Sequence, residues 1–345
     1  MRHMNLDYEL PLAHRLISSA IFVLQHVFNS KTLENIRKKN ANSAINFLRQ
    51  KLKSEGRTLG HKIDIDRINA DAESEFVKNY LNKNQPVIFE QAAKDWPCTQ
   101  KWNLQYLKEH YGDITLPLYE SKGLVEKEHD ETGDQIEPVL VEEIKARNFV
   151  DQIIAGKNKY LRFSLILENY PELINDFNNI WLKRMGKCFL GVGYQTFLGS
   201  AQRITPIHAG PTAFLYVMVD GEKKWSLFSA HSAALINPQT AGRVYNFTDV
   251  KINNPDPAIY PGFELLSRYE FTLKKGDVLF VPAWMWHEVE NLTTSWGMSY
   301  RVTSLRCFLR YPSLVFVRLF LTKPFFFKNF IDTFFLKKRT WAKLE

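Results

Sequence analysis

Cysteine is scarce in this chain of 345 residues, which contains only Cys98, Cys188 and Cys307. Three cysteines so far apart cannot form the framework of a disulfide-stapled domain, and without a C-x-x-C pair they offer no zinc knuckle. We therefore expect a reducing compartment, the cytoplasm.

Long apolar runs are also missing. The most apolar stretch, residues 10–28, is interrupted by His14, Arg15, Gln25 and His26, and no small-residue cleavage site follows it. This pattern predicts a helix, but neither a membrane span nor a signal peptide. A second, more polar helix is expected over residues 30–53.

Basic charge is missing from the middle of the chain. Residues 1–60 hold ten Lys/Arg against four Asp/Glu, and residues 311–345 hold seven against two. Because the whole chain has a net charge of +8, residues 61–310 have a net charge of −3. A central region of this sign is not suited to gripping phosphates, so no nucleic-acid partner is expected.

The size and composition allow one substantial core, since 45% of the residues are apolar and 14% are aromatic. We predict a helical N-terminal extension over residues 1–60, a catalytic domain over residues 61–310 and a basic, aromatic-rich helical tail over residues 311–345. The tail either packs against the N-terminal helices or a second copy in a homodimer, or contacts a membrane surface peripherally.

A carboxylate is missing where two histidine motifs suggest a metal. His208 lies in residues 205–210 (TPIHAG), and His287 ends residues 276–287 (GDVLFVPAWMWH). Non-heme Fe(II) oxygenases hold their metal with two histidines and one carboxylate. On a strand, the first histidine and the carboxylate lie at i and i+2, on the same side. Position i+2 is Gly210 here.

The chain resembles the JmjC-like or cupin-like Fe(II)/2-oxoglutarate-dependent oxygenases. The likeness rests on residues 85–89 (QPVIF), the segment Asp95-Trp96-Pro97, residues 101–113, the two histidine motifs and residues 221–225 (GEKKW). These segments occur in the family's order over about residues 61–305.

The resemblance implies a mainly β fold with flanking helices: a double-stranded β-helix of the cupin or jelly-roll type, with helical extensions at both ends. It implies Fe(II), 2-oxoglutarate and dioxygen as cofactors. His208 and His287 are then the metal ligands. For His287 the alternative is a packed core residue, but its position after the Gly-Asp-x-Leu-Phe-x-Pro turn favours the metal. Glu288 should point away from the metal.

Four residues are candidates to bind 2-oxoglutarate by resemblance. Thr205 lies three residues before the first histidine, and Lys223 lies 15 residues after it, as in an asparaginyl hydroxylase of the family. Tyr160 matches a hydroxyl donor on an earlier strand, and Arg301 is a further carboxylate partner. The alternatives are an ordinary hairpin lysine for Lys223, a core aromatic for Tyr160 and a salt bridge at the barrel end for Arg301.

Gly210 determines which reaction is expected. The Fe(II)/2-oxoglutarate halogenases have glycine or alanine at this position, and chloride or bromide fills the vacant coordination site. The resemblance therefore favours radical halogenation of an unactivated C–H bond, with Gly210 as part of the catalytic site. Hydroxylation with a carboxylate supplied from residues 122–138, and a binding protein without iron, are the alternatives.

The remaining pattern predicts helices over residues 71–82, 104–111 and 141–154, and strands over residues 86–89 and 115–119. A run of strands should follow from residue 189 to about residue 305. The aromatic residues near the histidines predict a pocket for a small, apolar or partly apolar substrate; these are Phe214, Tyr216, Trp284 and Trp286.

Overall fold

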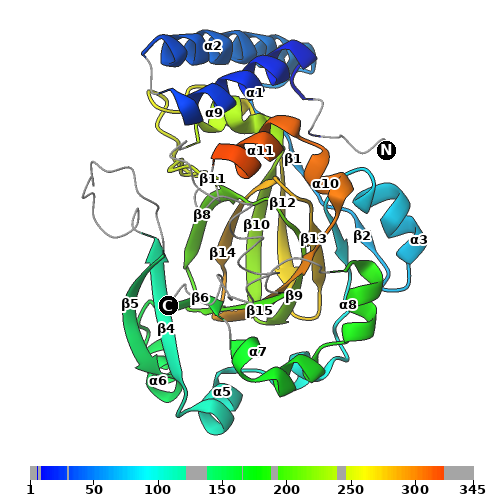
Figure 1. Ribbon diagram of the computed structural model, residues 1–345, viewed down its shortest axis with the longest axis vertical. Coiled ribbons are helices and arrows are strands. Elements are labelled where there is room, and N and C mark those ends of the chain that lie inside the picture. The colour runs from blue at the N-terminus through cyan, green and yellow to red at the C-terminus, as the bar shows by residue number, and fades with distance from the viewer. Residues whose placement is uncertain are drawn as a thin grey trace.

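Two large β-sheets face each other and form an open barrel, with helices on the outside (Figure 1). The structure, a computed structural model, describes residues 6, 9–28, 31–121, 138–164, 166–187, 193–238 and 246–321. The arrangement confirms the predicted cupin-like double-stranded β-helix with flanking helices.

One sheet has six strands. Their order is β1 (Lys62–Ile63), β12 (Arg268–Lys274), β10 (Glu222–Phe228), β14 (Trp286–Asn291), β8 (Ile204–Ala209) and β11 (Asn246–Phe247). Apart from the parallel β1–β12 pair, the strands are antiparallel. The strands that carry the two histidine motifs, β8 and β14, are therefore direct neighbours.

The other large sheet has seven strands. Their order is β2 (Arg67–Ile68), β3 (Val87–Phe89), β13 (Val278–Val281), β9 (Ala213–Asp220), β15 (Ser295–Val302), β7 (Tyr194–Gly199) and β6 (Tyr160–Ser164). A separate hairpin pairs β4 (Thr115–Ser121) with β5 (Pro138–Lys145).

Most helices are short and lie outside the barrel (Figure 1). In chain order they are α1 (Leu12–Val27), α2 (Lys31–Ser54), α3 (Glu73–Glu75), η2 (Phe76–Leu81), α4 (Pro97–Lys101), α5 (Leu104–Tyr111), α6 (Ala146–Ile154), α7 (Ile166–Asn169), η3 (Pro171–Asp176), α8 (Asn179–Met185), η4 (Ala230–Ser232), α9 (Ala233–Ile236), η5 (Phe263–Leu265), α10 (Leu305–Leu309), α11 (Pro312–Phe316) and η6 (Val317–Leu321). The predicted helices over residues 10–28, 30–53 and 104–111 correspond to α1, α2 and α5.

Side chains that alternate along the strands fill the barrel. Trp225 and Leu227 of β10 point inward with Leu273 of β12, whereas their neighbours Lys224 and Glu270 face outward. This alternation is typical of an antiparallel sheet with one face in the core and one in contact with solvent.

The long helix α2 supports the strand that carries His208. Its buried residues recur with helical spacing and form one stripe: Ala41, Ala44, Ile45, Leu48 and Leu52. The stripe packs in the same apolar cluster as Ile207 and Ala209 of β8 and Trp286 of β14. The outer side of the histidine-bearing strands is therefore fixed by the N-terminal helices.

One secondary-structure prediction was wrong. The helix predicted over residues 141–154 begins only at Ala146, because residues up to Lys145 belong to β5. Ile144 pairs with Leu116 of β4, and both side chains are buried. Pairing with β4 thus outweighs local helical propensity, and a short apolar run does not reveal this preference.

Two predicted segments fall outside the described residues. They are residues 122–137 of the segment 122–138 that could supply a carboxylate, and residues 322–345 of the tail; Cys188 also lies outside the described residues. Cys98 and Cys307 are buried free thiols, and burial raises the pKa of Cys98 to about 12.

Candidate functional site

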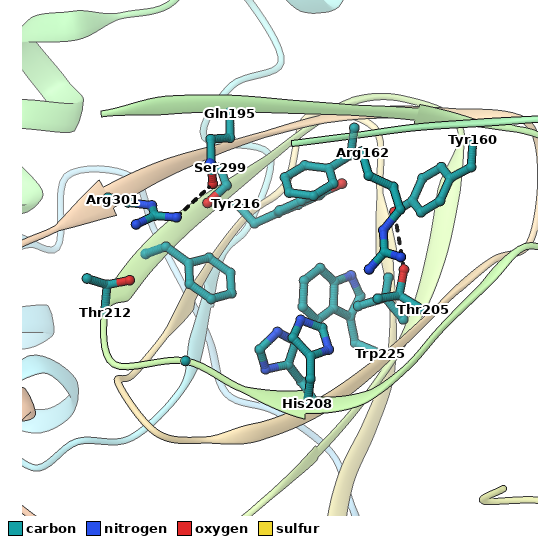
Figure 2. Close-up of a pocket in the computed structure, with 15 residues that line it drawn as sticks. Tyr160, Arg162, Gln195, Thr205, His208, Thr212, Tyr216, Trp225, Ser299 and Arg301 are labelled. Atoms are coloured by element: carbon teal, nitrogen blue, oxygen red, sulfur yellow. Dashed lines mark hydrogen bonds between the residues drawn. The ribbon is translucent and has the colours of Figure 1, made fainter. Parts of the chain in front are cut away.

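His208 and His287 lie side by side on neighbouring strands. They are cross-strand partners in the β8–β14 register, and their ring centroids are 4.1 Å apart. Directly opposite residues of an antiparallel pair turn their side chains to the same face. Both rings therefore face the same cavity, where Figure 2 labels His208.

A β-bulge brings Thr205 to the same side as His208. His287 pairs with His208 but Val289 pairs with Thr205, so three residues along β8 match two along β14. In a regular strand, residues three apart point to opposite faces. The extra residue reverses this, and the strand carries Pro206 at that point, where a proline is tolerated.

Backbone hydrogen bonds fix the tautomer of both histidines. Nδ1 of His208 donates to the carbonyl oxygen of Pro206, and Nδ1 of His287 donates to that of Met285, each at 2.9 Å. Burial holds the pKa of His208 well below its ordinary value and lowers that of His287 to about 4. Both rings are neutral at pH 7, with Nε2 carrying the free lone pair that a metal requires.

A turn in the left-handed region connects Gly210 to the second histidine motif. Trp284 has a φ of +66°, its backbone N–H donates to the carbonyl oxygen of Gly210 at 2.8 Å, and its indole N–H donates to that of Phe308. Such a backbone is costly for a residue with a side chain, and it persists because these contacts hold it. The position of Gly210 relative to His287 is therefore well defined.

No third ligand joins the histidines within the described part of the chain. Neither a carboxylate nor a cysteine there completes a metal-binding group of three. Two neutral imidazoles suit a divalent transition metal such as iron, so the residues fit a metal with two protein ligands. A carboxylate from residues 122–137 would come from outside the described residues, so that alternative stays open.

Two hydroxyl groups from different sheets meet at one side of the cavity. The Thr205 hydroxyl donates to the Tyr160 hydroxyl at 3.2 Å, as the dashed line in Figure 2 shows. Both side chains are almost fully buried, and burial raises the pKa of Tyr160. The structure thus brings together two of the predicted 2-oxoglutarate ligands.

Cations surround Tyr160. The guanidinium carbons of Arg162 and Arg203 lie 5.8 and 5.9 Å from the centroid of its ring. Arg162 follows Tyr160 by two residues on β6 and also points into the cavity (Figure 2). The sequence prediction missed Arg162, although the i, i+2 spacing after Tyr160 was a usable signal.

Lys223 lies behind this group and does not line the cavity. It is fully buried, its Nζ is 5.8 Å from the Tyr160 ring centroid and it donates to Oδ1 of Asn291 at 2.6 Å. Desolvation lowers the pKa of Lys223 to about 7. The surface-hairpin alternative is wrong, since an ordinary hairpin lysine would be exposed.

Arg301 lines the opposite side of the cavity from Tyr160. Its guanidinium donates to Oε1 of Gln195 at 3.0 Å, beside Ser299 and Thr212 (Figure 2). Within the register, Arg301 pairs with Phe214. The predicted co-substrate ligands therefore do not form one cluster, because Arg301 is separated from the Tyr160 group.

The cavity has a volume of about 670 Å³, including its mouth. Its apolar surface comes from Phe197, Phe214, Tyr216, Trp225 and Val289. Trp284 and Trp286, which we expected near the substrate, point elsewhere: the Trp284 ring packs against Phe308, and Trp286 belongs to the cluster around α2. No Asp or Glu occurs among the described residues that line the cavity.

Glu288 is on the outer side of β14, as predicted. It pairs with Ser226, and burial together with the nearby Glu290 raises its pKa to about 7. It therefore supplies no ligand to the site between the histidines.

Comparison with known proteins places these residues in a family. A model described as a cupin-like domain matches residues 72–304. The chain is 26% identical over 249 residues to lysine-specific demethylase 8 of Danio rerio, covering 69% of this chain and 58% of the relative. It is 26% identical over 250 residues to JmjC domain-containing protein D of Dictyostelium discoideum, covering 65% and 53%.

A third relative is covered over more of its length. The human tRNA wybutosine-synthesizing protein 5 is 27% identical over 250 residues, which are 67% of this chain and 75% of the relative. The chain spans little more than half the length of the first two relatives. The family model covers both histidine motifs, Lys223 and Tyr160, and shows that this chain belongs to the cupin-like family.

Proposed function

We propose that this protein is an Fe(II)- and 2-oxoglutarate-dependent enzyme that oxidises an unactivated C–H bond of a small molecule, by halogenation. The observation that carries the proposal is the cross-strand pair of neutral histidines, facing a cavity that is rich in cations. Membership of the cupin-like family and relatives named JmjC proteins support the oxygenase part.

His208 and His287 would hold the iron through Nε2. Their Nδ1 atoms already donate to backbone carbonyls, which fixes the orientation of the rings before a metal binds. Iron bound there would supply dioxygen activation coupled to the oxidative decarboxylation of 2-oxoglutarate.

Charge favours an anion in the position beside Gly210. A site with two histidines and one carboxylate places one negative charge beside the Fe(II) ion, whereas two neutral histidines place none. A bound halide would restore that charge. Arg162, which also lines the cavity, adds positive charge; burial is the main cause of the lowered pKa of His208, and the charge of Arg162 contributes to it. The electrostatics of the cavity therefore support an exogenous anion as the third ligand.

The Tyr160 side of the cavity would hold 2-oxoglutarate. A carboxylate is best held by charged donors and hydroxyls in a dry site. Thr205 and Tyr160 offer hydroxyls, Arg162 offers charge within the cavity, and Lys223 offers charge close to the Tyr160 ring. Desolvated Lys223 would regain its proton when the carboxylate arrives, because an opposite charge favours the charged form.

The substrate would be apolar or partly apolar. Phe197, Phe214 and Tyr216 give the cavity an aromatic wall, and Arg301 with Gln195 offers polar groups on the side away from Tyr160. Such a wall with a few polar groups is typical of a small-molecule site.

Hydroxylation is the second candidate, with water in place of halide. The names of the compared relatives favour it, since they include demethylases and no halogenase. A carboxylate from residues 122–137 would favour it further.

Succinate formation in chloride, bromide and halide-free buffer, with products analysed by mass spectrometry, tests the proposal. Halogenation predicts a product with one halogen and turnover that depends on halide. Halide-independent succinate with an oxygenated product would replace it with hydroxylation. If no substrate pool gives iron-dependent succinate, the protein is a binding protein and not an enzyme of this class.

An anaerobic crystal with Fe(II), 2-oxoglutarate and bromide gives a readout that does not depend on the substrate. Anomalous scattering from bromine beside iron is the expected result. Iron without bromine would argue against the halide part alone, while no iron would remove the proposal.

A further inference from the structure

Helix α1 turns an entirely apolar side to solvent. Each of its exposed residues is apolar, and the C-cap Phe28 is exposed as well; the set is Leu12, Ala13, Leu16, Ile17, Ala20, Leu24 and Val27. Their spacing of three and four residues forms one stripe along the helix. Leu16, for example, exposes 61% of its surface.

The inner side of α1 is partly polar. His14 Nδ1 contacts Oδ1 of Asn40 on α2 at 3.1 Å, and Nδ2 of Asn40 donates to the Ser18 hydroxyl at 2.8 Å. Ile21 and Phe22 provide its buried apolar residues. A surface helix usually turns its polar residues to solvent. Along the outer stripe of α1 this arrangement is reversed, and the packing of the fold does not require the reversal.

Further exposed apolar residues lie on the helices after the barrel. α1 contacts α11 and η6, and all three lie at the same end of the molecule (Figure 1). Phe316 and Phe320 are exposed there, Phe320 by 51%, and Leu305 and Leu309 are exposed on the adjoining α10. We call α1, α10, α11 and η6 together the helical face. Exposed apolar residues that gather on neighbouring elements are typical of an interaction site.

The charge on the helical face has one sign. Its sequences contain no Asp or Glu, whereas Arg306 on α10 and Arg310, directly after α10, are exposed. Lys38 and Lys39 are exposed on the neighbouring α2.

We propose that the helical face docks on the surface of an anionic lipid bilayer. An apolar helix stripe bordered by cations fits the boundary between acyl chains and negatively charged headgroups. Among the described helices none is long and apolar enough to cross a membrane, so α1 would lie in the plane of the surface.

A second copy of the chain fits the helical face less well. A two-fold interface would bring the same surface of both copies together. Arg306 and Arg310 of one copy would then approach Arg306 and Arg310 of the other, and the helical face has no acidic residue to offset their repulsion. Negatively charged lipid removes this repulsion and uses the same cations.

Vesicle sedimentation of the full chain tests the proposal. The protein should sediment with vesicles of phosphatidylcholine and phosphatidylserine, and much less with phosphatidylcholine alone or at high salt. Leu16→Glu should weaken vesicle binding at least about tenfold, the factor that corresponds to losing the burial of one large apolar side chain. Arg306→Glu should weaken only the binding that depends on phosphatidylserine.

Ile180→Glu is the matched control. Ile180 exposes 80% of its surface on α8, away from the helical face, so the same change there should leave vesicle binding intact. Light scattering of the wild type and each variant without lipid measures whether a dimer forms. The proposal is overturned if the wild type stays in solution, if Leu16→Glu and Ile180→Glu bind vesicles alike, or if a dimer forms that Leu16→Glu dissociates. These measurements need neither iron nor turnover, so they succeed or fail independently of the proposed reaction.

Discussion

The two sides of the cavity are built in different ways. At the histidine side, one sheet supplies both rings from opposite positions on β8 and β14. Gly210 occupies the position where a metal-binding carboxylate is expected. At the Tyr160 side, β6 of the other sheet contributes Tyr160 and Arg162, while Thr205 and Lys223 come from the first sheet. The histidine side has fewer protein ligands than an ordinary iron site, and the Tyr160 side has more cations than are needed to bind one carboxylate.

This difference argues against a decayed site. Burying a lysine without an opposite charge beside it is costly, and this desolvation lowers the pKa of Lys223 to about 7. If the cavity had no anion to bind, nothing in its chemistry would favour Lys223 beside Tyr160. Glycine at position 210 therefore accompanies a buried group of hydroxyls and cations around Tyr160, which supports the proposed co-substrate pocket.

Removing either histidine should have the largest effect. His208→Ala or His287→Ala leaves one imidazole, and we expect iron stoichiometry after anaerobic loading to fall to background. His231→Ala is the control, since His231 packs against Tyr311 outside the cavity. If both alanine variants bind as much iron as the control, the metal lies elsewhere.

Gly210→Asp should convert the histidine side into an ordinary three-ligand site. Gly210 is not among the glycines with positive φ, so its backbone can accept a side chain. A carboxylate would fill the vacant position and repel an incoming anion. We expect iron to be retained and halide-dependent product to disappear, as measured by mass spectrometry. Unchanged halide dependence would show that halide binds away from Gly210.

The Tyr160 side should control co-substrate affinity. A hydrogen bond to a charged group is worth about 1.5–3 kcal/mol, so Arg162→Met should raise the Kd for 2-oxoglutarate about ten- to a hundred-and-fifty-fold. Lys223→Met should raise the Kd by less, because the Lys223 ammonium lies behind Tyr160 and does not line the cavity. Arg301→Met changes the same charge at the opposite side of the cavity and should have little effect. Equal losses in all three variants, by calorimetry, would mean that the cavity acts only through its total charge.

Protonation of Lys223 offers a second readout of the same contact. Above pH 7 the Lys223 side chain is mostly a neutral amine in the free protein, because its pKa is about 7. A bound carboxylate would raise that pKa, so binding near pH 8 should take up about one proton. Calorimetry in two buffers of different ionisation enthalpy measures this uptake, which Lys223→Met should remove. Its persistence in that variant would assign the proton to another group.

The sequence predicted the parts of the site that local motifs determine. Both histidines, the glycine and the turn before His287 are read from short segments, and the family resemblance gave the barrel. Thr205 was found only by resemblance, because regular alternation would turn it away from His208. The bulge at Pro206 depends on pairing between strands 80 residues apart, which no local pattern reveals.

Arg162 and the strand β5 show a second limit. The i, i+2 spacing places Arg162 on the same side of β6 as Tyr160, but this side faces the cavity only because β6 pairs with β7 at the edge of the sheet. The strand β5 forms through register with β4, whereas local propensity suggested a helix. In both cases long-range pairing decides which face a residue occupies.

The smallest expected effect concerns stability. Lys223 has a folded pKa of about 7 against an ordinary value of about 10.4, so the unfolded chain holds the proton more tightly. Stability therefore rises as the pH increases from about 7 to about 10.4, and the cost of burying the charge is greatest below that range. Lys223→Met removes this cost but leaves Asn291 without its donor, a loss of about 1 kcal/mol.

The methionine variant should therefore be more stable than the wild type near pH 6, by about 1–3 kcal/mol, and the difference should shrink or reverse near pH 10. Urea unfolding at several pH values measures it. Lys224→Met is the matched control, because Lys224 is the next residue on β10 and faces outward near Glu270. A wild type as stable as the Lys223 variant near pH 6 would mean that the buried ammonium already has a compensating partner without 2-oxoglutarate. The Tyr160 side would then be a structural ion site, and the contrast with the histidine side would no longer favour a working co-substrate pocket.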